Sequence, residues 1–465
     1  MKKIRFYDNA GNILIPEGVN VRTAVQNAID LLPKNAKIHI TSDLLTPNAE
    51  TNTISPLTSS KNVVGNLNLE DVTLRFESDS LNFTDYIEIA YQGATSIAAP
   101  KKGFTIDTKK KHRFGTWVKM DSFHLKGYFT DWMHCRDLVC NRLYEQIMRS
   151  HITGIRPFDS ANNFDNDYRQ RVDVGAMCHI DGFPVELYIN DVYWGLYSLN
   201  IKKNRDNYLQ KKADTAQIQI EMADFTNLNR NFNWSTVEIR NPKSDSGNTS
   251  FQEGKEPNSG EVKTSWTNFM SFMNALTEET SKELIETHLN IQSFIDSLLL
   301  ADLACVWDSF VHNSLFTTWN GVQYSILMYD MDLTWGIEND FKTTYPQGNA
   351  LVPATYRTFY RNTSDNLGTN SNTMSLCVWF PTLLTIYADE IKAQYAELRK
   401  SVFNESNIIG LFDTLTRDIG FNVYKDDLAR WDYPSYTDIS DGVERIADWL
   451  KQRLAYLDEK YGYSI

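Results

Sequence analysis

The stretch WDSFVHNSLFTTWNGVQYSILMYDMDLTWG, Trp307 to Gly336, carries the strongest signal for the fold. Two runs of apolar and β-branched residues flank the dipeptide Asn320-Gly321. Asn-Gly accepts the positive φ angles that a tight type I′ turn demands. The segment therefore predicts a hairpin of two antiparallel strands, Leu315 to Trp319 and Tyr324 to Tyr329.

Polar side chains stand on both sides of this hairpin. Asp308 and Asn313 precede it, and Asp330 and Asp332 follow it. Phosphoryl transfer from ATP needs carboxylate and amide oxygens that hold magnesium against the phosphates, and one carboxylate that orients the attacking hydroxyl. In that chemistry Asp308 is the catalytic candidate, and Asn313 and Asp330 are candidate metal ligands. Asp332 shares a strand face with Asp330, so either aspartate could be the ligand.

The same four residues also have a structural interpretation. Asp308 would cap a helix, Asn313 would stabilise a turn, and Asp330 and Asp332 would lie at a solvated strand end. Each residue taken alone fits this interpretation well. The order Asp, Asn, hairpin, Asp favours the chemical one.

The rest of the chain divides into regions of different periodicity. Strands are predicted where β-branched or aromatic residues alternate, and helices where apolar residues recur three and four apart. The predicted strands cover 87–91, 103–107 and 185–190, and the predicted helices cover 131–149, 264–276, 280–288, 291–307 and 443–457. Residues 1–80 look separate, with a helix over 21–32 and a strand over 37–41. Polar stretches over 223–261 and 362–373 predict loops.

Composition and charge exclude several classes of protein. The chain has 465 residues, of which 42% are hydrophobic, so it is long and apolar enough for a large globular body. A net charge of −13 repels a phosphate backbone, which argues against bulk binding of nucleic acid. Five widely spaced cysteines without a C-x-x-C pair favour a reducing compartment.

No targeting or membrane segment is expected. The N-terminus leads from Lys2 and Lys3 into charged residues rather than into the apolar run of a signal peptide. The most apolar stretch, Phe294 to Trp307, contains two aspartates and is too short to span a bilayer. We therefore expect a soluble protein that does not act in a membrane, in the cytoplasm or associated with a virion.

Four segments in register resemble the spore coat protein H (CotH) kinase family. They are YQGATSIAAPKKGFTID (Tyr91 to Asp107), HLKGYFTDWMHCRDLVCNRL (His124 to Leu143), GFPVELYINDVYWGLYSLN (Gly182 to Asn200) and the Asp/Asn segment quoted above. The resemblance runs over about Tyr91 to Gly336, with a consistent helical tail to Tyr456. It implies an α+β fold of the protein-kinase-like, two-lobed type. The β-rich lobe would cover 81–210 and the mainly helical lobe 211–465, with 1–80 as a small β-rich appendage.

The resemblance also implies the cofactors and further site residues. The turn with Gly93, Thr95 and Ser96 would cover the phosphates of ATP, and Lys101 or Lys102 would face them. Lys102 is favoured because it directly precedes the predicted strand 103–107. The alternative is that both lysines belong to a solvated basic face. The implied activity is Mg²⁺-dependent transfer of the ATP γ-phosphate to a hydroxyl of a protein substrate.

Two departures from the family pattern put this activity in doubt. The phosphate turn has Ala94 and Thr95 where the family commonly has asparagine and serine. Asn200-Ile201-Lys202 stands where the family has an acidic residue, so the orientation of the lysine or the contact with adenine could be altered. The alternative is a catalytically inactive CotH-like protein that serves a surface or virion assembly through a protein partner. The sequence leaves the oligomeric state open.

Two other clusters are weaker candidates. Cys178 and His179 are neighbours in a predicted strand and point to opposite faces, so they would not meet as nucleophile and base. The acidic run Asp159 to Asp167 lacks the spacing and the bidentate glutamate of a calcium loop. We interpret it as a polar turn.

Overall fold

The computed structural model describes the helices and sheets of the chain. The described residues are 6–7, 13–14, 21–57, 72–93, 95–150, 179–222, 232–245, 251–252, 254–306, 309–310, 312–339, 349–351, 354–355, 379–433 and 439–464. They form a mixed α+β fold. Several sequence predictions fall outside them: Asp308, Cys178, the acidic run 159–167 and the loop 362–373.

Seven strands close into a barrel in the order β10-β11-β9-β8-β7-β6-β3. Among its described strands β10 and β3 pair in parallel, and the other six neighbouring pairs are antiparallel. Alternate residues fill the interior, for example Ile89, Ile106 and Leu125, each at most 2% exposed. The strands are β3 (Ala36–Thr41), β6 (Thr73–Glu77), β7 (Asn82–Gln92), β8 (Gly103–His112), β9 (Met120–Lys126), β10 (Gly182–Ile189) and β11 (Val192–Ile201).

Part of the segment expected to form a separate appendage belongs to this barrel. β3 and β6 both lie within residues 1–80, and β3 pairs with β10 as well as with β6. Helix α1 (Val21–Ile29) packs on a helix from beyond residue 130, α2 (Arg136–Arg149). A free-standing appendage would not make these pairings. β3 makes them because the barrel closes only when a strand lies between β10 and β6. Local periodicity carries no information about that long-range partner.

A second sheet carries the predicted hairpin. Its order is β13-β12-β14-β15, and its strands are β12 (Ile218–Met222), β13 (Val237–Asn241), β14 (Ser314–Thr318) and β15 (Ser325–Met328). β14 and β15 pair antiparallel, as the sequence predicts, and Ser314 lies opposite Met328. The connection between the two strands is longer than the expected two-residue turn. β14 ends at Thr318, and β15 begins at Ser325. Of the Asn-Gly pair only Gly321 has a positive φ, 71°.

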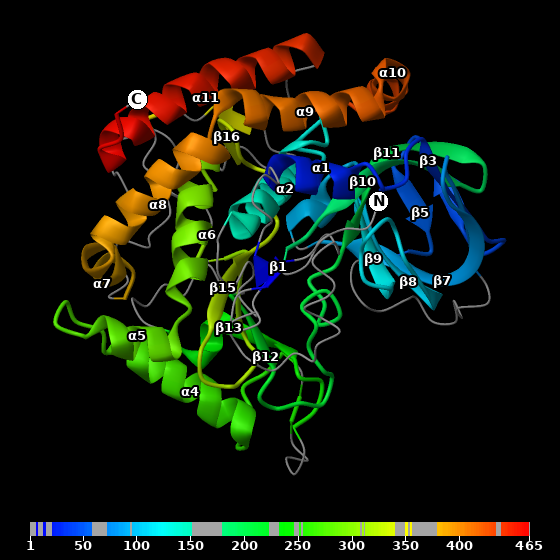
Figure 1. Ribbon diagram of the computed structural model, residues 1–465. Coiled ribbons are helices and arrows are strands. Elements are labelled where there is room, and N and C mark those ends of the chain that lie inside the picture. Colours follow the sequence, from blue (N-terminus) through cyan, green and yellow to red (C-terminus); the bar gives the residue numbers. More distant parts are fainter. Residues whose placement is uncertain are drawn as a thin grey trace.

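Helices cover the second sheet and one side of the barrel (Figure 1). α6 packs on β15 and on α2, while α9 lies beside α11 and α10 packs on β11. Asn290 and Asn404 cap α6 and α9 by accepting backbone N–H groups. Besides α1 and α2, the described helices are α4 (Glu261–Asn274), α5 (Lys282–His288), α6 (Ile291–Ala304), α7 (Trp379–Ile386), α8 (Ala388–Ser401), α9 (Glu405–Ile419), α10 (Phe421–Arg430) and α11 (Ile439–Tyr461).

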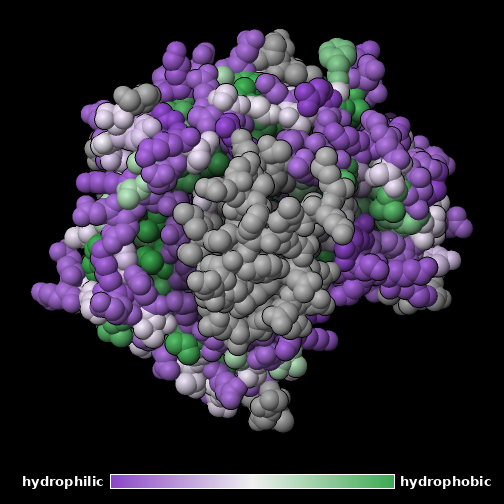
Figure 2. All heavy atoms as spheres, in the orientation of Figure 1, coloured by the Kyte–Doolittle hydropathy of each residue, from purple (hydrophilic) through white to green (hydrophobic). Residues whose placement is uncertain are grey.

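Short elements complete the described fold: β1 (Phe6–Tyr7), β2 (Ile13–Leu14), β4 (Thr46–Asn48), β5 (Thr53–Ser55), β16 (Ile337–Asn339), β17 (Asn349–Leu351) and the 3₁₀ turns Thr95–Ala98 and Trp234–Thr236. Hydrophilic residues cover most of the described surface on the face shown in Figure 2. Within the described residues, no helix is long and apolar enough to cross a membrane.

Candidate functional site

The predicted metal ligands Asn313 and Asp330 lie next to each other. Asn313 directly precedes β14 and Asp330 follows β15, so the antiparallel hairpin brings both to one edge of the sheet. Asn313 Nδ2 is 3.5 Å from the carbonyl oxygen of Asp330, and the N–H of Tyr329 donates to the Asn313 carbonyl at 3.2 Å. Both residues have left-handed backbones, with φ of 45° and 58°, a conformation that Asn and Asp tolerate better than most residues.

The left-handed backbone of Asp330 changes the expected relation to Asp332. β15 ends at Met328, so neither aspartate lies in the strand and the rule that alternate strand residues share a face does not apply. Asp330 turns toward the barrel. Asp332 Oδ2 lies 3.5 Å from Thr130 Oγ1, at the limit of a hydrogen bond.

A lysine that the sequence reasoning did not select faces Asp330. Lys126 is the last residue of β9, and its Nζ is 2.8 Å from Asp330 Oδ1. The inward-facing Phe123 and Leu125 fill the barrel, so the alternation of β9 directs Lys126 outward. The Lys126 side chain is 17% exposed and that of Asp330 36%. The ion pair joins the barrel to the second sheet.

Asp137 on α2 is a second residue that the sequence reasoning missed. It is buried, and its Oδ1 accepts the N–H of Met331 at 2.8 Å, between the two predicted ligands. Asn141 Nδ2 donates to the same oxygen at 3.0 Å, while Tyr128 and Asn200 donate to Oδ2. A carboxylate bound at both oxygens holds the backbone of the Asp330–Asp332 segment in place.

Charges at this site influence one another. Burial acts to raise the pKa of Asp330, but Lys126, with smaller contributions from Lys203 and His312, lowers it. Burial acts to lower the pKa of Lys126, but Asp330, Asp332 and Asp137 together raise it. The pKa of Asp137 is raised, first by burial and next by the negative charge of Asp330. Lys126 is thus the main positive charge that offsets the repulsion among these carboxylates.

A buried acid on β12 holds the residue before Asp330. Glu221 accepts the Tyr329 hydroxyl and forms ion pairs with Lys203 and Arg240. Burial acts to raise the pKa of Glu221, yet the two cations lower it. The ammonium of Lys203 also lies 4.0 Å from the centre of the Tyr329 ring. The end of β15 is therefore fixed from the sheet side as well as from α2.

Neither predicted phosphate-facing lysine occupies the place of Lys126. The Lys101 side chain is 0% exposed, and its Nζ pairs with Asp427 Oδ1 at 2.8 Å. Lys102 Nζ donates to the Ala99 carbonyl at 2.9 Å, which ties it back to its own turn. Asp427 is 326 residues away along the chain, so no local pattern reveals this partner of Lys101. A role of Lys101 or Lys102 at the phosphates stays a prediction.

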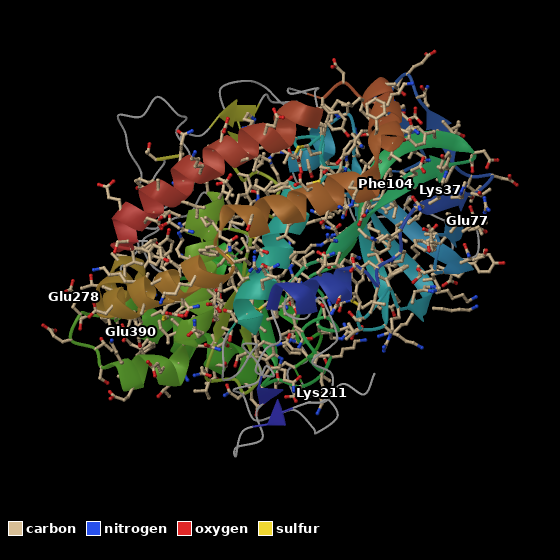
Figure 3. All side chains as sticks on the ribbon, turned by 45° about the horizontal axis from the view of Figure 1, so that its top comes forward. Lys37, Glu77, Phe104, Lys211, Glu278 and Glu390 are labelled. Carbon is tan, nitrogen blue, oxygen red and sulfur yellow. The ribbon has the colours of Figure 1, made fainter. Side chains whose placement is uncertain are left out.

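The segment that follows the predicted phosphate turn lies against Gly127, the residue after Lys126. Gly93 is exposed with φ of +120°, and a Cβ there would lie 2.0 Å from Ser96 Oγ. Thr95 and Ser96 open a 3₁₀ turn that ends at Ala98. A Cβ on Gly127, the residue after Lys126, would lie 3.0 Å from the Lys101 carbonyl. Figure 3 labels Phe104 on β8, which pairs with Leu125 next to this turn.

The oxygen donors of the site suit a hard divalent cation. Asn313 offers an amide oxygen, and Asp330 and Asp332 offer carboxylates, which are ligands typical of Mg²⁺. Among the residues that the structure describes, no group of three or more His, Cys, Asp or Glu side chains has the geometry of a metal site. The amide of Asn313 does not belong to these side-chain types, and Asp308 lies outside the described residues.

Protein kinases hold Mg²⁺ with an asparagine and an aspartate and carry a lysine on a strand near the phosphates. The family model described as "CotH kinase protein" matches residues 89–457. This match covers most of the chain, so the protein belongs to the CotH kinase family. It confirms the resemblance that the four sequence segments indicate. A comparison with curated proteins found no match.

Proposed function

We propose that this protein is a kinase that transfers the γ-phosphoryl group of ATP to a hydroxyl of a protein substrate, with Mg²⁺ as the metal. The observation that carries the proposal is the meeting of Asn313, Asp330 and Lys126 from two sheets at one place. Protein kinases hold their metal ions with an asparagine and an aspartate and place a strand lysine near the phosphates. The family match supports the same activity.

The order of elements along the chain also supports the proposal. In protein kinases a glycine-containing turn between two strands precedes the strand with the lysine, and a helix with an acidic residue follows. Here the turn after β7 contains Gly93, the next strands are β8 and β9 with Lys126 at the end, and α2 with Asp137 follows. We propose that the barrel serves as the lobe over the nucleotide and that the second sheet with its helices forms the other lobe.

Each residue then has a defined task. Asn313 and Asp330, with Asp332 nearby, would hold Mg²⁺, which when bound neutralises charge on the phosphates. Lys126 would exchange its contact with Asp330 for one with a phosphate oxygen. Asp308 would orient the hydroxyl of the protein substrate. The turn with Gly93, Thr95 and Ser96 would cover the phosphates, and its backbone N–H groups could bind them.

The position of Ile201 bears on the doubt about catalysis. Its side chain is 1% exposed, and it pairs with Phe123 of β9. A carboxylate at that position would enter an apolar environment, whereas Lys126 already has the carboxylate of Asp330 as its partner. The orientation of the lysine therefore does not depend on an acidic residue at 201. This supports the active kinase over the inactive assembly protein.

Isothermal titration of the full chain with ATP tests the proposal. We expect ATP to bind in the presence of Mg²⁺ and to bind much more weakly when EDTA removes the metal. Titration with MgSO₄ in the absence of nucleotide is the control, and we expect only weak binding there. Asn313→Ala should reduce the Mg²⁺-dependent part, because it removes an oxygen ligand. Absence of binding at millimolar MgATP would contradict the proposal and favour the alternative of an inactive protein in a surface or virion assembly.

A further inference from the structure

The ammonium group of Lys101 lies in a closed cluster that the proposed chemistry does not use. Asp427 on α10 accepts from Lys101 Nζ at 2.8 and 3.0 Å through its two oxygens. The Tyr433 hydroxyl lies 2.5 Å and His134 Nε2 3.2 Å from the same nitrogen. The side chains of Lys101 and Asp427 are 0% and 1% exposed. Residues from three distant parts of the chain thus meet at one lysine.

The same aspartate fixes α10 on the barrel. Asp427 Oδ1 accepts the N–H of Leu196 on β11 at 2.7 Å. Trp431, just after α10, donates from Nε1 to the Trp194 carbonyl at 2.9 Å. Gly195 lies between these contacts with φ of +129°, and a Cβ there would be only 2.7 Å from Asp427 Oδ1. This close approach requires glycine, so α10 and β11 have one well-defined relative position.

Lys101 connects this contact to the candidate site. It lies in the segment Thr95–Lys102, between the 3₁₀ turn and the start of β8. Its carbonyl is 3.0 Å from where a Cβ of Gly127 would stand, and Gly127 follows Lys126 directly. A displacement of Lys101 therefore changes both the segment that would cover the phosphates and the end of β9.

A buried ion pair is a costly way to fasten two elements. Removing both charges from water costs several kcal/mol, and an apolar pair of similar volume often gives equal stability. What the charged pair adds is direction, because the ammonium must meet the carboxylate at hydrogen-bonding distance. The aromatic rings of Tyr197 and Tyr433, with centroids 5.1 and 5.2 Å from Lys101 Nζ, further restrict the ammonium.

We infer that Lys101 and Asp427 are positioning residues, through which helix α10 fixes the segment Thr95–Lys102 and thereby sets the affinity for nucleotide. This rests on the proposed ATP site. Neither residue touches nucleotide in this account; both act through the backbone between the 3₁₀ turn and β8. The C-terminal part of the chain would thus tune a site that is otherwise built from the barrel and the second sheet.

Two measurements on the full chain test the coupling. Hydrogen exchange without nucleotide reports the order of the segment 95–102, and titration with MgATP reports affinity. Asp427→Asn leaves the Lys101 ammonium buried without its counter-ion, which could prevent folding. The double variant Lys101→Met with Asp427→Asn removes both charges, and its asparagine can still accept from Leu196 N–H. We expect faster exchange over 95–102 and affinity reduced about 10- to 100-fold, since small misplacements have effects of this size.

Lys34→Met is the matched control. Lys34 pairs with Asp418, which also joins the N-terminal region to the C-terminal helices, but the pair is 41% and 19% exposed. In the Lys34→Met variant we expect no change in hydrogen exchange over 95–102 and no change in the affinity for MgATP. Unchanged exchange over 95–102 in the double variant would overturn the coupling. Faster exchange with unchanged affinity would overturn the positioning role. A wild-type protein that binds no MgATP would overturn the proposed function, and exchange alone would then decide the coupling.

Discussion

Lys126 Nζ lies 2.8 Å from Asp330 Oδ1, although 204 residues separate the two in the chain. The lysine ends a barrel strand and the aspartate follows a strand of the second sheet, so the pair links the two sheets. An ion pair between a strand lysine and a candidate metal ligand also explains how the site can hold several carboxylates before any cation binds.

Replacing Lys126 with methionine should weaken the binding of MgATP by roughly 10- to 100-fold, because it removes the ammonium group that would contact a phosphate oxygen. The unfolding free energy should fall by only about 1 kcal/mol, since the pair is partly exposed. Titration and denaturant unfolding measure the two effects. Lys111→Met is the control, because Lys111 forms an exposed pair with Asp206 elsewhere on the barrel. Equal affinity in all three proteins would show that Lys126 does not face the nucleotide.

Replacing Asp137 with alanine should raise the Mg²⁺ concentration needed for half-maximal ATP binding. The N–H of Met331 would lose its acceptor, and the segment with Asp330 and Asp332 would lose its fixed position. Stability should also fall by about 3 kcal/mol, the typical loss for one member of a buried polar network. Asp296→Ala on α6 removes another buried aspartate and should lower stability without moving the Mg²⁺ midpoint. A shared shift in both variants would reduce the role of Asp137 to general stability.

Replacing Glu221 with glutamine should lower the unfolding free energy by about 3 kcal/mol, because Lys203 and Arg240 lose the carboxylate that neutralises them in a buried setting. Glu238→Gln on the neighbouring strand is the control. Glu238 pairs with the same Arg240 but is 42% exposed, so its loss should change stability by less than about 1 kcal/mol. Thermal or denaturant unfolding distinguishes the two, and equal effects would contradict the account of this cluster.

The buried Lys101 predicts a specific dependence of stability on pH. Burial lowers its pKa from 10.5 to about 8, in spite of the opposite pull of Asp427. Between these values the unfolded chain binds more protons at this lysine than the folded chain does. The unfolding free energy of the wild type should therefore rise from about pH 8 to about pH 10.5 relative to the double variant Lys101→Met with Asp427→Asn. A constant difference over this range would show that the folded-state pKa is not lowered.

The sequence predicted those parts of the site that depend on neighbours along the chain. A hairpin brings its two ends together, so the placement of Asn313 beside Asp330 follows from the strand pattern and the Asn-Gly connection. Lys126 was within reach of the same reasoning. It lies in a quoted segment, after the alternation of Phe123 and Leu125, and that alternation alone directs it away from the barrel interior.

Other features depend on partners that are distant in the chain. Lys101 looks like a surface lysine beside a glycine-containing turn, and only the contact with Asp427 on α10 reveals its burial. In the same way β3 looks like part of an independent appendage until β10 pairs with it and the barrel closes. Periodicity along one segment reports which face is buried, but it does not report what covers that face.

Magnesium-dependent phosphoryl transfer by the purified chain tests the central claim most directly. The measurement follows labelled γ-phosphate from ATP into protein for the wild type, Asp308→Ala and Asp330→Ala, each with Mg²⁺ and with EDTA. The account predicts transfer by the wild type with Mg²⁺ and a loss of at least about 100-fold in both variants. Equal incorporation in all three proteins, or incorporation that EDTA leaves unchanged, would contradict it.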